Sequence, residues 1–199
     1  MKETLKTAVV TGASQGVGRE ISLILAEKGC DIVIVARSAD KLEAVKNDIL
    51  QLFPDRSVYV CPCNLASSDG PEKVLDFCKQ NSLTVDLLIN NAGSGLFGES
   101  VELGDSVLPM LNLNITALTR MCSLFGKEMK TRGSGSILNI GSIAGNQPSS
   151  YFASYAATKS YVFNYTLALR YELKRYGVNV TLVQPGYIRT NFDNVCGVT

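Results

Sequence analysis

Residues 7–18 read TAVVTGASQGVG, a short apolar run that is followed at once by a turn with three glycines. The apolar run is typical of a buried strand, and the residues after it have the periodicity of an amphipathic helix. Glycine permits unusual backbone angles at such a turn and lets an anion approach the backbone. The free N–H groups and the positive dipole end of the helix favour the same anion. The residues of this predicted phosphate site are Gly12, Ser14, Gly16, Val17 and Gly18.

Apolar, β-branched runs alternate with helical stretches along the whole chain. Several of these runs are near-continuous Val, Ile and Leu, as expected of parallel strands covered on both faces. The predicted strands are 7–11, 31–36, 57–61, 85–90, 136–140 and 178–183, and the predicted helices are 16–28, 39–52, 70–81, 103–132 and 151–176. This alternation favours right-handed βαβ units. We therefore expect one domain over 1–199, a Rossmann-type doubly wound parallel sheet with helices on both faces, in three αβα layers.

The composition narrows the class of protein. The net charge of +1 gives no reason to expect nucleic acid or an acidic membrane as a partner. No run is as long as a membrane span, and the N-terminus is too polar for a signal peptide. The six cysteines form no C-x-x-C pair, and there is no histidine, so we expect no metal site. Unpaired cysteines in apolar runs fit a reducing compartment, which predicts a cytoplasmic protein.

The second predicted strand bears on which dinucleotide the glycine turn would hold. The glycine spacing G-x-x-x-G-x-G differs from the common dinucleotide fingerprint, and a flexible connection has the same composition. Arg37 follows the strand 31–36, where an acidic residue would favour NAD and an arginine accommodates the 2′-phosphate of NADP. A solvated surface arginine is the alternative. Together with the glycine turn, Arg37 predicts NADP as cofactor, with NADPH preferred over NADH and Ser14 as a further contact.

Tyr155 and Lys159 lie four residues apart in a predicted helix, so that their side chains share one face. A tyrosine with a pKa near 10 is a poor acid or base at neutral pH. A nearby ammonium, or the positive ring of an oxidised nicotinamide, would lower that pKa. Ser142 follows the predicted strand 136–140. Its hydroxyl would hydrogen-bond the substrate oxygen that Tyr155 also contacts. The alternative is an ordinary tyrosine at the edge of the core beside a solvated lysine.

These features belong to a longer series of motifs. In chain order they are Thr11-Gly12-x-x-x-Gly16-x-Gly18, Asn90-Asn91-Ala92-Gly93, Asn114, Ser142, Tyr155-x-x-x-Lys159 and Pro185-Gly186-x-x-x-Thr190. In order and spacing, over nearly the whole chain, they resemble the single-domain branch of the short-chain dehydrogenase/reductase family. The resemblance implies an NADP(H)-dependent enzyme that reduces a ketone or aldehyde, or oxidises the alcohol, by hydride transfer.

The resemblance also implies roles for the catalytic residues. Tyr155 would be the general acid in reduction and the general base in oxidation. Lys159 would hold the nicotinamide ribose and lower the pKa of Tyr155. Ser142 would orient the substrate carbonyl, and Asn114 would bind a water that links Lys159 to solvent.

Further cofactor contacts follow from the same resemblance. Residues beside the adenosine ribose would include Asn91, Ala92 and Gly93. Residues that flank the nicotinamide would be Pro185, Gly186, Ile188 and Thr190. Asn64 and Leu65 stand where relatives carry Asp-Leu against the adenine, and the Asn64 side chain still donates and accepts. An apolar substrate pocket would be lined by Gly95, Leu96, Phe97, Tyr151, Tyr187 and Phe192.

The chain departs from the family at its C-terminal end. Relatives continue beyond Thr190 with a substrate-covering helical loop, another helix and a final strand, so we expect a domain that lacks these elements and favour an incomplete sequence. The sixth strand would then have an exposed edge. A dinucleotide-binding scaffold or redox sensor with little turnover is the alternative function. Epimerases and dehydratases of related chemistry are longer and carry another glycine spacing.

The resemblance extends to self-association. The stretches 111–129 and 161–171 carry large apolar residues on more than one helical face. In the family these helices form a dimer contact, often within a tetramer. We therefore expect a homodimer or homotetramer, although a thick core layer would give the same pattern.

Overall fold

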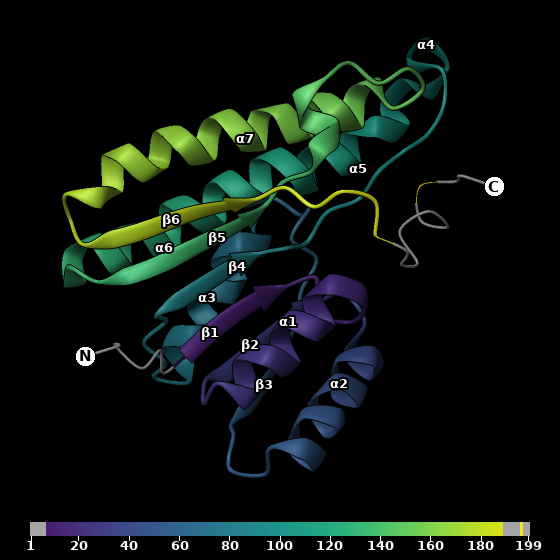
Figure 1. Ribbon diagram of the computed structural model, residues 1–199. Coiled ribbons are helices and arrows are strands. Elements are labelled where there is room, and N and C mark those ends of the chain that lie inside the picture. Colours follow the sequence, from purple (N-terminus) through teal and green to yellow (C-terminus); the bar gives the residue numbers. More distant parts are fainter. Residues whose placement is uncertain (1–6, 189–195, 197–199) are drawn as a thin grey trace.

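Six parallel strands form a single sheet in the order β3-β2-β1-β4-β5-β6 (Figure 1). The computed structural model describes residues 7–188 and 196. The strands are β1 (Thr7–Thr11), β2 (Asp31–Ala36), β3 (Val58–Pro62), β4 (Leu87–Asn90), β5 (Gly135–Ile140) and β6 (Val178–Val183). The strand order reverses between β1 and β4, the point at which open α/β sheets bind their ligands. The predicted doubly wound fold is confirmed.

Helices cover the sheet on both faces and form the outer layers (Figure 1). The helices on one face are α1 (Gly16–Glu27) and α2 (Ala39–Leu52). The helices on the other face are α3 (Gly70–Gln80), α6 (Leu118–Arg132) and α7 (Ala153–Lys174). The hydrophobic core therefore has two parts, one on each face of the sheet. Ala8 and Val10 pack toward α1 and α2, whereas Val9 between them packs toward α3 and α6. Both faces of β1 are buried, which explains its continuous apolar sequence.

The predicted helix 103–132 is interrupted. A short helix, α4 (Ser100–Leu103), ends at Gly104, whose φ of +49° leaves the helical region. A 3₁₀ turn, η1 (Gly104–Val107), and another short helix, α5 (Leu108–Leu111), follow. A π-helical turn, η2 (Asn112–Ala117), then leads into α6. The pattern predicted a continuous helix because apolar periodicity does not reveal a π turn, which tertiary contacts stabilise.

A buried polar network joins α7 to the centre of the sheet. The Asn90 side chain donates from Nδ2 to Asn139 Oδ1 at 2.9 Å, which joins β4 to β5. Asn139 Nδ2 donates to Thr166 Oγ1 of α7 at 3.0 Å, and that hydroxyl donates to Val162 O at 2.6 Å. All three polar side chains are buried. Satisfied buried networks specify one packing arrangement, so this network fixes the position of α7 on the sheet.

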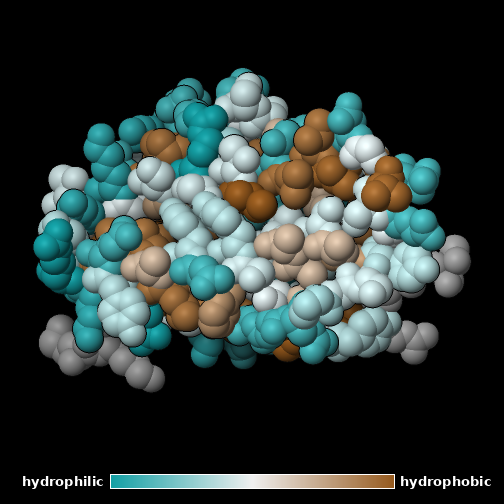
Figure 2. Space-filling model, turned by 90° about the horizontal axis from the view of Figure 1, so that it is seen from above, coloured by the Kyte–Doolittle hydropathy of each residue, from teal (hydrophilic) through white to brown (hydrophobic). Residues whose placement is uncertain are grey.

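The β6 edge of the sheet and the face covered by α7 are both at the surface. Within the described residues β6 is an edge strand, with Val178 and Val180 buried and Asn179 and Thr181 exposed. Figure 2 looks onto the α7 side, where hydrophobic side chains gather toward the end that carries α4 and α5. In the described part of the chain, no helix is both long and apolar enough to cross a membrane.

Candidate active site

The carboxyl ends of the parallel strands bring most of the predicted residues to one edge of the sheet. The glycine turn follows β1, and the segment 91–93 follows β4. Ser142 follows β5, and Pro185 follows β6. The switch point between β1 and β4 lies at the centre of this edge. The edge is therefore the place where a ligand is expected in this fold.

The glycine turn folds tightly against α1 and the end of β4. Gly12 and Gly16 have φ of +67° and +55°, angles that favour glycine. A Cβ on Gly18 would lie 2.3 Å from Gly12 O, so α1 can approach the turn only with glycine there. Gln15 precedes α1 and caps it with no side-chain hydrogen bond. The amide groups of the first turn of α1 therefore fit a phosphate group.

Thr11 and Asn91 hold the glycine turn against the end of β4. Thr11 Oγ1 donates to Ile89 O at 3.2 Å and accepts from the amides of Asn91 and Ala92, both at 3.0 Å. Asn91 Nδ2 donates back to Thr11 O at 2.9 Å and to Gly12 O at 3.2 Å. Asn91 was predicted beside the cofactor, which stays a prediction, and its side chain positions the glycine turn. Thr11 was part of the predicted motif but was given no role of its own, because its hydrogen bonds depend on the packing of β1 beside β4.

Three other predicted cofactor residues lie after β2 and β3. Arg37 is exposed directly after β2 and forms no ion pair with any described residue. Asn64 is exposed after β3, and its Oδ1 accepts from Ala66 N at 3.2 Å. The Leu65 side chain is buried in the core below. Of these three residues, Arg37 carries a charge, and that charge is available to bind an anion.

Ser142 and Tyr155 meet although they come from different elements. Ser142 lies two residues after β5 in an extended conformation, and its Oγ accepts from Ala144 N at 3.2 Å. Tyr155 lies in the first turn of α7, and its side chain is hydrogen-bonded to Ser142. Burial raises the pKa of Tyr155 above its ordinary value, and the bond to Ser142 offsets part of this rise. Two hydroxyl groups are therefore available to one substrate oxygen.

Lys159 lies one turn further along α7 and is buried. Its Nζ donates to Ile140 O at 3.0 Å and lies 5.8 Å from the centroid of the Tyr155 ring. Burial lowers the pKa of Lys159 to about 8. The sequence predicted that Lys159 lowers the pKa of Tyr155; burial has the largest effect on that pKa in the structure and raises it, and the role of Lys159 stays a prediction.

Asn114 occupies the π-helical turn η2 and is buried. Its Nδ2 donates to Ser94 O at 2.8 Å and to Thr158 Oγ1 at 3.0 Å, and its Oδ1 accepts from Ser94 N at 3.0 Å. A Cβ on Gly93 would lie 3.4 Å from Asn114 Oδ1 and 3.5 Å from Lys159 Nζ. These two polar atoms therefore border the same small space beside Gly93. Ser94 and Thr158 were missed, because their role depends on this tertiary arrangement.

The segment after β6 is joined to the loop that carries Ser142. Pro185 O accepts from Ile143 N at 3.2 Å, and Gln184 Nε2 donates to Ser142 O at 3.2 Å. Gly186 and Ile188 are exposed beside this junction. Thr190, predicted beside the nicotinamide, and Phe192, predicted in the substrate pocket, lie outside the described residues.

Acidic and thiol side chains form no metal centre in the part of the chain that the structure describes. There, no group of three or more His, Cys, Asp or Glu is placed to hold a metal ion. Burial raises the pKa of the Cys61, Cys78 and Cys122 thiols to about 12, 11 and 12. These thiols are core residues rather than reactive groups.

Comparison with known proteins identifies the family. The family model described as short chain dehydrogenase matches residues 6–196. This chain belongs to the short-chain dehydrogenases. An uncharacterized oxidoreductase of Staphylococcus aureus (strain N315) is 34% identical over 191 residues, which are 94% of this chain and 80% of that protein.

Solved structures resemble this short-chain dehydrogenase closely. A short-chain dehydrogenase from Sphingobium yanoikuyae in complex with NADPH is 30% identical, with a TM-score of 0.92 over 98% of this chain and 76% of that chain. A bulky-bulky ketone specific alcohol dehydrogenase from Comamonas testosteroni is also 30% identical, with a TM-score of 0.88 over 94% of this chain and 75% of that chain. The fold of the site is thus that of a known group of oxidoreductases.

The lowered pKa of Lys159 predicts how stability depends on pH in this short-chain dehydrogenase. The unfolded chain keeps the lysine proton up to its ordinary pKa of 10.5, whereas the folded protein loses it near 8. The unfolded state therefore holds more protons between these values, so that the free energy of unfolding gains a term that rises with pH. Lys159→Met removes this term. We expect the stability of the variant relative to wild type to fall between pH 8 and 10.5 by up to roughly 3 kcal/mol, since one pKa unit corresponds to about 1.4 kcal/mol.

Urea unfolding of both proteins, followed by circular dichroism at several pH values, measures this difference. Two stability curves that stay parallel from pH 7 to 10.5 would show that burial does not perturb Lys159.

Proposed function

We propose that this short-chain dehydrogenase is an NADP(H)-dependent oxidoreductase that reduces a ketone or aldehyde, or oxidises the corresponding alcohol. The observation that carries the proposal is the hydrogen-bonded pair of Ser142 and Tyr155, with Lys159 one turn below. The pair lies at the same edge of the sheet as the glycine turn. Proton transfer and dinucleotide binding are therefore placed at one site.

The chain offers a fitting place for the dinucleotide. The phosphate groups would lie against the glycine turn and the start of α1, where a Cβ on Gly12 would come within 2.9 Å of Ala92 Cα. Pro185 and Gly186 would lie near the nicotinamide, and Lys159 near its ribose. When bound, the dinucleotide supplies the hydride to the substrate or accepts it. The Sphingobium yanoikuyae structure, described as a complex with NADPH, supports this assignment.

Ser142 and Tyr155 would act together on the substrate oxygen. In reduction the hydride adds to the carbonyl carbon, and the Tyr155 hydroxyl gives its proton to the oxygen, so that an alcohol results. Ser142 would donate a hydrogen bond to that oxygen and keep it beside the phenol. In oxidation the same proton returns from the alcohol to Tyr155.

In reduction Tyr155 would act as the protonated phenol, which is its form at neutral pH. After the transfer the phenolate must regain a proton. Lys159 lies close by, and its Nζ borders the same space as Asn114 Oδ1, which gives a water molecule two polar partners. These two residues would form the path of the returning proton.

Arg37 would distinguish NADPH from NADH. It is the exposed cation that directly follows β2, and no described residue engages it in an ion pair. The planar guanidinium group suits a phosphate better than a ribose hydroxyl. Ser14, in the glycine turn, would add a hydroxyl contact.

Self-association is also part of the proposal. Leu108 of α5 and Tyr161 and Tyr171 of α7 are large side chains that stay exposed on the surface. Exposed large hydrophobic side chains on these two helices support a homodimer or homotetramer.

Tyr155→Phe tests the catalytic assignment. The variant keeps the ring and its packing but loses the proton that the reaction needs. We expect turnover with a carbonyl substrate to fall at least about a hundredfold, while NADPH affinity, measured by fluorescence titration, stays within a factor of a few. Turnover near background in wild type and variant alike, with NADPH still bound, would instead favour a dinucleotide-binding scaffold or redox sensor with little turnover.

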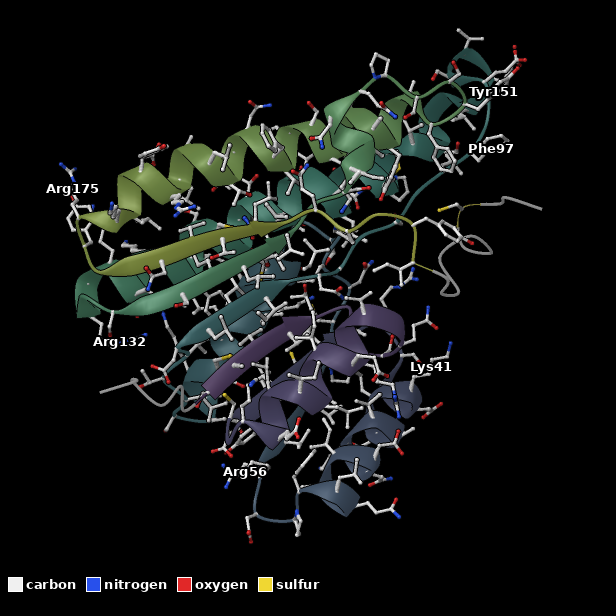
Figure 3. All side chains as sticks on the ribbon, viewed as in Figure 1. Lys41, Arg56, Phe97, Arg132, Tyr151 and Arg175 are labelled. Atoms are coloured by element: carbon white, nitrogen blue, oxygen red, sulfur yellow. The ribbon has the colours of Figure 1, made fainter. Side chains whose placement is uncertain are left out.

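Arg37→Ala tests the cofactor preference. Loss of a hydrogen bond to a charged group costs about 1.5–3 kcal/mol, which corresponds to roughly a 10–100-fold weaker affinity for NADPH. The affinity for NADH should hardly change. Arg175→Ala is the matched control, because Arg175 is an exposed arginine at the opposite end of the molecule from Lys41 and the start of α2 (Figure 3). Equal losses of NADPH and NADH affinity in Arg37→Ala would contradict the assignment.

A further inference from the structure

Four aromatic side chains form a continuous row that begins at Tyr155 and ends in solvent. The Phe152 ring packs edge-on against Tyr155, with centroids 5.8 Å apart, and against Phe97, with centroids 5.2 Å apart. Phe97 in turn stacks on Tyr151 at 5.5 Å. Phe97 and Tyr151 come from the loops after β4 and β5 and lie together at one end of the molecule (Figure 3). We call these four residues the aromatic row.

The outer part of the aromatic row is exposed but firmly held. Phe97 is 42% exposed and Tyr151 is 51% exposed. Gly98 N donates to Tyr151 O at 2.9 Å, and Phe97 N donates to Cys196 O at 3.0 Å, so three separate segments hold the two rings. Tyr151 has a φ of +61°, a left-handed conformation that costs about 1–2 kcal/mol for a residue other than glycine. Such strain persists where the surrounding structure imposes it and gathers at ligand sites.

The described residues around the aromatic row are mostly uncharged. The segments 91–98, 141–158 and 184–188 contain no Asp, Glu, Lys or Arg, and the buried Lys159 directly follows the second of them. Glu99 and Glu102, at the start of α4, are exposed beside this region. These two exposed carboxylates would repel an anionic substrate. Hydrophobic side chains also gather at this end of the molecule (Figure 2).

We propose that the aromatic row recognises the substrate, and that the substrate is an uncharged ketone with an aromatic ring next to its carbonyl group, or the corresponding secondary alcohol. The inference rests on the proposed function, because the row starts at the tyrosine that protonates the carbonyl oxygen. A ring attached to the reacting carbon lies against Phe152 and Phe97 when the oxygen is bonded to Tyr155. Phe97 and Tyr151 are then specificity-determining residues.

Aromatic contacts set the size of the expected effect. Pairs of rings at such distances contribute about 0.5–1.5 kcal/mol beyond the burial of their area. This range corresponds to a preference of roughly 2–12-fold over an aliphatic ring of the same size. The preference should appear mainly in KM, since the contacts form on binding and change little in the transition state.

The test compares two ketones that differ only in the ring. Reduction of 1-phenylethanone and of 1-cyclohexylethanone by NADPH is measured for wild type, Phe97→Leu and Tyr151→Asn. Asparagine tolerates a positive φ, so the second variant removes the ring without adding backbone strain. We expect wild type to favour the phenyl ketone several-fold in kcat/KM, and both variants to bring the ratio toward one. Leu52→Asn, at an exposed leucine at the end of α2 and outside the row, is the control and should keep the wild-type ratio.

The outcomes separate this inference from the proposed function. If wild type reduces both ketones equally well, or if neither variant changes the ratio, the aromatic row does not select the substrate, although the protein is still a reductase. If the protein binds NADPH in a fluorescence titration but reduces neither these ketones nor any of a broad set of carbonyl compounds, the proposed function fails and the inference fails with it. Melting curves of the two variants show whether each is folded.

Discussion

The site depends on the hydrogen bonds by which Thr11 and Asn91 join the end of β1 to the end of β4. Thr11 Oγ1 accepts two backbone amides that follow β4, and Asn91 Nδ2 donates to two carbonyls of the glycine turn. These bonds lie at the switch point of the sheet, just beyond the last pair of the β1–β4 ladder, Val10 with Ile89. They fix the position of the glycine turn beside β4. With β4 held in this way, Gly93 lies between Asn114 and Lys159.

A second constraint is burial, which sets the protonation of the catalytic groups. Tyr155 and Lys159 lie on a helix that a buried network through Asn139 fastens to the sheet. Removal from water favours the neutral form of each, so the pKa of the phenol rises and that of the ammonium falls to about 8. At neutral pH the phenol is therefore protonated, whereas the amine titrates near pH 8.

The sequence predicted the fold well where one local signal decided it. The helix 39–52 and the strands 7–11, 31–36 and 178–183 were predicted with the observed bounds, because apolar runs and turn residues mark their ends. The interruption near Asn114 was not predicted, since a π turn is stabilised by contacts with Ser94 and Thr158 that are distant in sequence. The motifs likewise indicated which residues gather at the sheet edge, but not that Asn91 would turn toward the glycine loop or that burial would raise the pKa of Tyr155.

The most direct measurement of the central claim follows the hydride itself. The purified protein is incubated with NADPH that carries deuterium at C4 of the nicotinamide, prepared separately as each epimer, and with 1-phenylethanone. Mass spectrometry then locates the label. Hydride transfer at the site of Ser142 and Tyr155 predicts deuterium on the carbinol carbon of the alcohol from one epimer only. Bound NADPH that never passes its label to this or any other carbonyl compound would contradict the assignment of the site as a reductase.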